Sequence, residues 1–349
     1  MKLRFSIYIG LFSSLCITLC LQVSSSSFPQ ARVSQLPPLA AGCHFDIAKQ
    51  SFRGTTIEQA RCLLRKVKVR ADLEPQPIPA QLESKFDKPV NFDRNILREY
   101  LEKHGIDPIE IGGQLDRPLS RAKNNEQNAP LARYLVIHDT STPNMCEISD
   151  CTSVGFPTTI NEPSWPYNDP DRSSYTSFKR AHLFILRDGR SVAPSRPDGA
   201  KVSFEFPTSL NGVKLEDKYP ESKGVFLHVE NVQPRNCRPE YISKKTCATW
   251  QQNRAGERFK VYNDNVAPDP GFSTPQLRRL ALVYIAASVR RSKWLIPTFH
   301  AAVDAGIPGA HDDPQNFNLQ SWSDMIHDVL CEMKVECSVG NSIPPKVVD

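Results

Sequence analysis

The stretch Tyr134-Leu135-Val136-Ile137-His138 decides the fold of this chain and points to its chemistry. Its four apolar residues, rich in β-formers, predict a short buried strand that ends at a histidine. A side chain at the end of a strand is held by a rigid element, so its geometry does not depend on a loop. A lone histidine in such a place is most often a packing or surface residue, so its meaning depends on the rest of the chain.

Short strands and helices alternate on the C-terminal side of this run. Residues 182–186, bounded by Asp188-Gly189, and residues 225–229 predict two further strands. The strongest helix signal is Ser273-Thr274-Pro275-Gln276, where a cap residue precedes a proline in the first turn. The pattern predicts an α/β fold in which a mixed β-sheet is covered by helices, rather than a barrel or a bundle.

Composition divides the chain into segments. A positively charged start, an apolar run at 5–23 and serines at 24–27 predict a signal peptide over 1–27, with a transmembrane helix as the alternative. Residues 28–42 are rich in proline and small residues and predict a linker. Residues 43–125 predict a small helical N-terminal region of unknown role, with a capping box at Thr55–Glu58. A polar stretch then marks a boundary before the α/β domain at 126–335, which a C-terminal tail follows at 336–349.

The cysteines indicate an oxidising compartment. Ten cysteines are present, and eight remain after Cys16 and Cys20 leave with the signal peptide. An even number in an exported chain suggests disulfides. The expected pairs are Cys146–Cys151, Cys237–Cys247, Cys331–Cys337 and, less securely, Cys43–Cys62. Free buried thiols are the alternative, and we expect a periplasmic or secreted protein with no stable membrane span in its mature form.

The charge of the chain gives little information about partners. The formal net charge of +5 falls by two, to about +3, when Lys2 and Arg4 are removed. So weak a surplus predicts neither a nucleic-acid footprint nor a membrane-binding face.

Three side chains far apart in the sequence form a candidate ligand set. His138 ends the strand at 134–137, His300 follows the apolar run at 294–299, and Asp313 precedes Pro314. Two imidazoles and one carboxylate suit catalytic zinc, which keeps its fourth tetrahedral position for a water that it acidifies. This set predicts a metal-dependent hydrolase.

Four motifs in this order resemble those of the type-2 N-acetylmuramoyl-L-alanine amidases, which are related in fold to the peptidoglycan recognition proteins. The motifs are residues 136–141, residues 181–189, the helix from Pro275, and His300 with Asp313-Pro314, and together they span about residues 131–330. The resemblance implies that 126–335 is a zinc amidase domain with His138, His300 and Asp313 as ligands. In the family, zinc polarises the amide carbonyl and activates the water that cleaves the bond between N-acetylmuramic acid and L-alanine in peptidoglycan.

Two other functions fit the same resemblance. One is a peptidoglycan-binding protein that has kept the fold without hydrolysis. Receptors of that kind typically lose a zinc ligand, and this chain keeps all three, which favours the enzyme. The other is a zinc amidase acting on a different amide, since fold does not fix substrate.

The chain departs from the family pattern at the catalytic residues. Where the family strand usually has Gly-Ile-Glu, this chain places His228 at the glutamate position and Glu230 two residues later. Residues two apart face the same side of a strand, and we favour Glu230 as the general base because a carboxylate is the expected chemistry. His311 stands where the family often has lysine and is the expected oxyanion partner. The spacing after His300 is longer than usual, so Asp312 competes with Asp313 as a ligand; the Asp-Pro pairing favours Asp313.

Three further residues are candidate substrate contacts. The family also has a histidine at the strand position of His182. The resemblance implies that His182 is a donor that faces the substrate or supports the metal site. The alternative is a core histidine whose hydrogen bonds go to the backbone. Trp165 and Tyr175 lie in an insertion rich in aromatics and prolines between two strands. Loops on a rigid scaffold often carry binding residues, so stacking on a sugar is one expected role of these rings, although ordinary loop packing is favoured.

Overall fold

The computed structural model describes residues 42–119, 131–145, 155–176, 181–206, 212–237, 250–252, 258–260 and 265–337. The chain from Leu39 onward forms one compact unit. The predicted signal peptide and nearly all of the predicted linker and C-terminal tail lie outside the described residues. In the part that is described, we find no helix with both the length and the apolar character needed to cross a bilayer.

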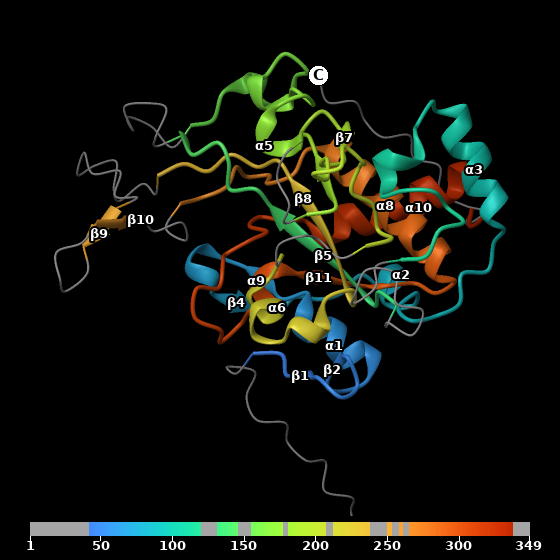
Figure 1. Cartoon of the computed structure of the whole chain (residues 1–349), viewed down its shortest axis with the longest axis horizontal. Coiled ribbons are helices and arrows are strands. Elements are labelled where there is room, and N and C mark those ends of the chain that lie inside the picture. Colours follow the sequence, from blue (N-terminus) through green and yellow to red (C-terminus); the bar gives the residue numbers. More distant parts are fainter. Residues whose placement is uncertain are drawn as a thin grey trace, which may run out of the picture. The chain divides into compact units, whose positions relative to one another are not determined.

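A five-stranded sheet lies at the centre of the unit (Figure 1). Its strand order is β11-β5-β8-β6-β7, with the first four strands parallel and β7 antiparallel to β6. The strands are β5 (Tyr134–Asp139), β6 (Leu183–Ile185), β7 (Ser191–Val192), β8 (Phe226–Asn231) and β11 (Ile296–Phe299). The predicted α/β class with a mixed sheet is therefore confirmed, and each of the three predicted strands is present.

The register of β5 against β8 places several polar side chains on one face of the sheet. Val136 pairs with His228, and His138 pairs with Glu230. Because paired residues in a sheet, and residues two apart on a strand, point to the same side, His138, His228 and Glu230 share a face. The side chains between them, such as Ile137 and Val229, point to the other face and are fully buried.

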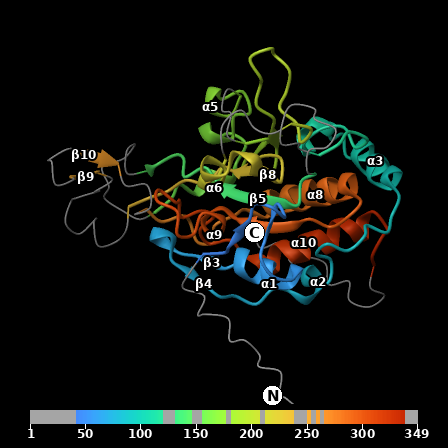
Figure 2. The same ribbon diagram turned by 60° about the horizontal axis from the view of Figure 1, so that its bottom comes forward.

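Two long helices, α8 (Thr274–Arg291) and α10 (Leu319–Glu332), pack against each other, as Figures 1 and 2 both show. α8 begins as predicted, because the Ser273 side chain accepts a hydrogen bond from Gln276 N and the Gln276 side chain accepts one from Ser273 N. Both helices share one hydrophobic core with the apolar residues of β5 and β8.

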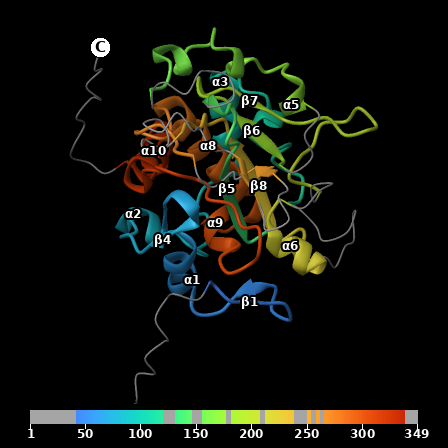
Figure 3. The ribbon, with the colours of Figure 1, turned by 90° about the vertical axis from the view of Figure 1, so that its left-hand side faces the viewer.

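The N-terminal region packs directly on the sheet. Its helix α1 (Thr56–Leu63) begins with the predicted capping box. The strand β1 (Phe45–Asp46) pairs with β2 (Ser51–Phe52), and α1 and β1 lie in the lower part of Figure 3. The Phe52 ring lies 5.3 Å from that of Tyr134 on β5, and Phe52 N donates to the Tyr134 hydroxyl. The boundary predicted near residue 126 lies outside the described residues, but the parts on either side of it share one core.

The remaining helices are α2 (Ala80–Glu83), α3 (Arg94–Lys103), α5 (Ser173–Thr176), α6 (Lys214–Lys218) and α9 (His300–Val303), with 3-10 turns at η1 (Val69–Ala71), η2 (Pro108–Ile111), η3 (Thr158–Asn161), η4 (Pro166–Asn168) and η5 (Pro220–Ser222). Two small antiparallel pairs join β3 (Lys66–Val67) to β4 (Leu73–Glu74) and β9 (Trp250–Gln252) to β10 (Arg258–Lys260).

Two of the predicted disulfides are confirmed. Cys43 is joined to Cys62, and Cys331 to Cys337. Cys237 is also disulfide-bonded, while its predicted partner Cys247 lies outside the described residues. The predicted Cys146–Cys151 pair lies outside them as well.

Candidate metal centre

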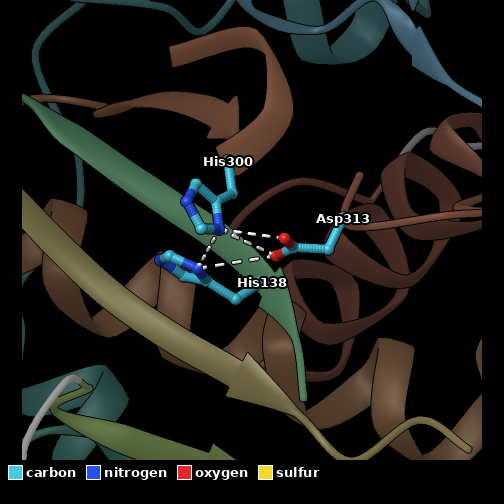
Figure 4. Close-up of side chains that lie close together, drawn as sticks. All are labelled: His138, His300 and Asp313. Atoms are coloured by element: carbon cyan, nitrogen blue, oxygen red, sulfur yellow. Dashed lines mark hydrogen bonds and ion pairs between the residues drawn. The ribbon is translucent and has the colours of Figure 1, made fainter. Parts of the chain in front are cut away.

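His138, His300 and Asp313 meet at one edge of the sheet (Figure 4). His138 lies near the end of β5, and His300 is the first residue of α9, directly after β11. Because β5 and β11 are parallel neighbours with Ile137 opposite Phe299, the two histidines emerge side by side. Asp313 comes from the loop between α9 and α10, and all three side chains are buried.

The spacing of the donor atoms suits a metal ion. His138 Nδ1 lies 3.0 Å from His300 Nδ1. The Asp313 carboxylate lies 2.9 Å from His300 Nδ1 and 3.6 Å from His138 Nδ1. Metal–ligand bonds of about 2.1 Å place tetrahedral donor atoms about 3.4 Å apart. These three residues therefore form a cluster that could hold an ion, as predicted.

The other nitrogen of each imidazole faces another polar side chain. His300 Nε2 lies 2.9 Å from Asp304 Oδ2, and His138 Nε2 lies 3.0 Å from His228 Nδ1. A partner of this kind on the nitrogen that does not bind metal selects the tautomer and orients the ring. Both rings thus present Nδ1 to the shared position beside Asp313.

Two carboxylates that support these rings were not predicted from the sequence. Glu216 Oε1 lies 3.2 Å from His228 Nε2, and Asp304 accepts hydrogen bonds from Lys214 N and Leu215 N as well as facing His300. The spacing of His300 and Asp304, four residues apart at a helix start, was a signal that could have found Asp304. Nothing local marks Glu216, because its contact depends on how α6 packs.

The electrostatics favour an ionised Asp313 beside a neutral His138. Burial, followed by the charge of His300, lowers the pKa of His138 to about 3. Burial alone would raise the pKa of Asp313, but His300 and His138 hold it well below its usual range. Burial would likewise lower the pKa of His300, but Asp313 and Asp304 raise it well above the ordinary value. Asp313 and His138 are therefore held in forms that bind metals, whereas His300 would release a proton when an ion binds.

Asp312, the competing ligand, is engaged elsewhere. Its carboxylate lies 3.6 Å from Arg235 Nη1 and accepts hydrogen bonds from Gln315 Nε2 and Arg70 N. Asp313 joins the two histidines instead. The choice of Asp313 over Asp312 therefore agrees with the geometry.

The two expected catalytic residues are located differently: His311 lies beside the cluster, and Glu230 is located by its strand register. His311 Nδ1 is 4.0 Å from Asp313 Oδ1, and its side chain is 44% exposed, so it lies where solvent approaches the buried ligands. Glu230 is partly buried on β8, directly in register with His138. Their roles as oxyanion partner and base stay predictions.

His228 and His182 lie deeper. His228 is on the opposite side of the His138 ring from Asp313 and is 1% exposed. His182 is fully buried; its Nδ1 accepts from His228 N, and its Nε2 lies 2.8 Å from Phe206 O. These contacts match the alternative of a core histidine bonded to backbone, and they place His182 behind His228 rather than beside the ligands.

Trp165 and Tyr175 lie in a second hydrophobic cluster with Phe184, Leu186 and Val232. Trp165 is 6% exposed, and the Tyr175 hydroxyl donates to Tyr167 O. Their contacts are those of loop packing, the alternative to a sugar-binding role.

Comparisons with models of protein families, with curated proteins and with solved structures found no match.

Proposed function

We propose that this protein is a zinc-dependent N-acetylmuramoyl-L-alanine amidase of an exported compartment, built on an amidase-like α/β fold. The observation that carries the proposal is the buried triad of His138, His300 and Asp313, which offers two Nδ1 atoms and one carboxylate to a common point. Two imidazoles and a carboxylate are the donors of many catalytic zinc sites, whereas structural sites usually complete four protein ligands. The choice of peptidoglycan as the substrate rests on the resemblance of the motifs at 131–330 to those of the family.

A bound zinc ion would supply Lewis-acid polarisation of the amide carbonyl and acidify the attacking water. The chain's own residues would do the rest. Glu230, in register with His138, would accept the proton of that water. His311, the exposed neighbour of Asp313, would donate a hydrogen bond to the developing oxyanion.

Further observations support an exported amidase. The two histidine ligands lie at the carboxyl ends of parallel strands, where α/β sheets commonly place their sites. Disulfides join Cys43 to Cys62 and Cys331 to Cys337, as expected of a protein in an oxidising compartment.

The test is digestion of purified peptidoglycan by the metal-free and the zinc-loaded protein, followed by mass analysis of the soluble products. We expect the loaded protein to release stem peptides with a free L-alanine amino group, and His138→Ala to release none. If the protein binds peptidoglycan but releases no product, a recognition protein without hydrolysis is favoured. Zinc-dependent cleavage of a different amide would overturn the proposed substrate.

A further inference from the structure

The short helix α6 contacts the supporting partners of both histidine ligands. Asp304 accepts hydrogen bonds from Lys214 N at 2.8 Å and Leu215 N at 2.9 Å while its Oδ2 faces His300 Nε2. From the same helix, Glu216 reaches His228, which in turn faces His138. One five-residue helix is therefore linked to both imidazoles by separate routes.

The second route joins Glu216 to His138 through His228. Glu216 is an acceptor on both oxygens, because Oε2 accepts from Gly212 N at 2.9 Å and Oε1 faces His228 Nε2. If His228 is neutral and donates from Nε2 to Glu216, its Nδ1 accepts a hydrogen bond from His138 Nε2. The Nδ1 lone pair of His138 is then turned toward His300 and Asp313.

The backbone before α6 is fitted to this arrangement. A Cβ atom on Gly212 would lie 2.4 Å from His228 Nδ1, so a side chain there would collide with the ring. Glu216 is 2% exposed and His228 is 1% exposed, so water has little access to the contact between them. A buried carboxylate–imidazole pair of this kind is costly unless its geometry is well satisfied, which favours a specific role.

We propose that α6 is the common support of the two imidazole ligands, so that metal binding and the docking of this helix on the sheet are coupled. Glu216 is a positioning residue that acts on His138 through His228, and Asp304 is a positioning residue that acts on His300. This inference rests on the metal site of the proposed function, but not on its substrate.

The first test compares zinc dissociation constants, measured by competition with a chromophoric chelator. Glu216→Gln offers one acceptor oxygen to two donors, and Glu216→Met offers none. Removing a partner of a metal-bound histidine typically weakens metal binding about 10- to 100-fold, and we expect both variants to fall in that range. The matched control is Asp217→Asn on the same helix, which also removes a negative charge but from an exposed side chain, and it should keep wild-type affinity.

Two further readouts separate positioning from general stability. Nitrogen-15 shifts of the His138 ring should show a proton on Nε2 in the metal-free wild type and a mixture of tautomers in Glu216→Gln. In the wild type, added zinc should slow hydrogen exchange at the Lys214 and Leu215 amides, a measurement that decides the matter even if the variants do not fold.

The outcomes distinguish the two proposals. Wild-type zinc affinity in both Glu216 variants, or exchange at α6 that zinc does not change, would overturn the role of α6. Tight zinc binding without amidase activity would overturn only the proposed function. A wild-type chain that binds no divalent metal would overturn the site on which both depend.

Discussion

Arg235 holds Asp139 through Nη2, which lies 2.8 Å from Oδ1 and 2.7 Å from Oδ2, with both side chains buried. Asp139 follows His138 directly, and it also accepts a hydrogen bond from Gln315 N at 3.1 Å. Asp139 N in turn donates to Asp313 Oδ2 at 3.2 Å. The ion pair therefore ties the end of β5 to the loop that carries the third ligand.

Removing Arg235 should destabilise the fold strongly. Arg235→Ala leaves Asp139 and Asp312 buried without their shared cation, and breaking a buried pair typically costs about 3–5 kcal/mol. Chemical denaturation of the metal-free protein measures the loss. Lys68→Ala, which breaks the solvent-exposed ion pair with Glu74, should cost about 1 kcal/mol or less. Equal stabilities of the two variants would contradict the role given to Arg235.

Replacing a ligand should abolish metal binding. His300→Ala removes one of the three donors, so we expect loss of both metal retention and activity. His327, which lies outside the cluster, provides the control, and His327→Ala should bind metal normally. Elemental analysis after dialysis measures the metal content. Full zinc occupancy in His300→Ala would refute the ligand assignment.

Neutralising the expected base should separate binding from turnover. Glu230→Gln keeps all three ligands, so we expect wild-type zinc content with a loss of activity of about 10²–10⁴-fold, the usual worth of general-base assistance. His228→Gln, by contrast, should weaken metal binding, because His228 faces His138. Full activity in Glu230→Gln would show that another group takes the proton.

The aromatic insertion should contribute to stability rather than to substrate affinity. Trp165 is buried beside Ile160, Phe184 and Val232, so Trp165→Ala should cost about 3–5 kcal/mol. Tyr175→Phe removes only the hydrogen bond to Tyr167 O, worth about 0.5–1.5 kcal/mol. A Trp165→Ala protein of wild-type stability that binds peptidoglycan weakly would restore the sugar-stacking hypothesis.

Few free thiols should remain in the mature protein. Cys43, Cys62, Cys331 and Cys337 are paired, and Cys237 is also disulfide-bonded. Thiol titration of the denatured, unreduced protein measures the remainder, and a reduced sample is the control. A count near eight would contradict the disulfides and weaken the case for export.

Local pattern was sufficient for much of the fold. The apolar run before His138 predicted β5, and the cap at Ser273 predicted the start of α8, because both signals depend on neighbouring residues in the chain. The capping box at Thr55 predicted α1 in the same way. The ligand set also followed from sequence, with the help of the family resemblance.

The supporting contacts could not be read from local pattern. His138 and His228 are 90 residues apart, and their contact exists because β5 and β8 pair in one register. The sequence pattern predicted that His228 and Glu230 lie on the same face of the strand. It did not predict which of them lies behind the His138 ring. Trp165 likewise lies in a loop, and whether its ring is exposed depends on the segments that cover it.

The sequence by itself determined the strands, the capped helices and the two candidate histidine ligands, with Asp313 favoured over Asp312, since short-range backbone preferences and apolar periodicity act along the chain. Only the tertiary structure decided that Asp313 rather than Asp312 joins the histidines, and that Glu216 and Asp304 support them. The physical reason is that a buried polar side chain must satisfy its hydrogen bonds with whatever the packing brings near it, and those partners come from distant parts of the chain.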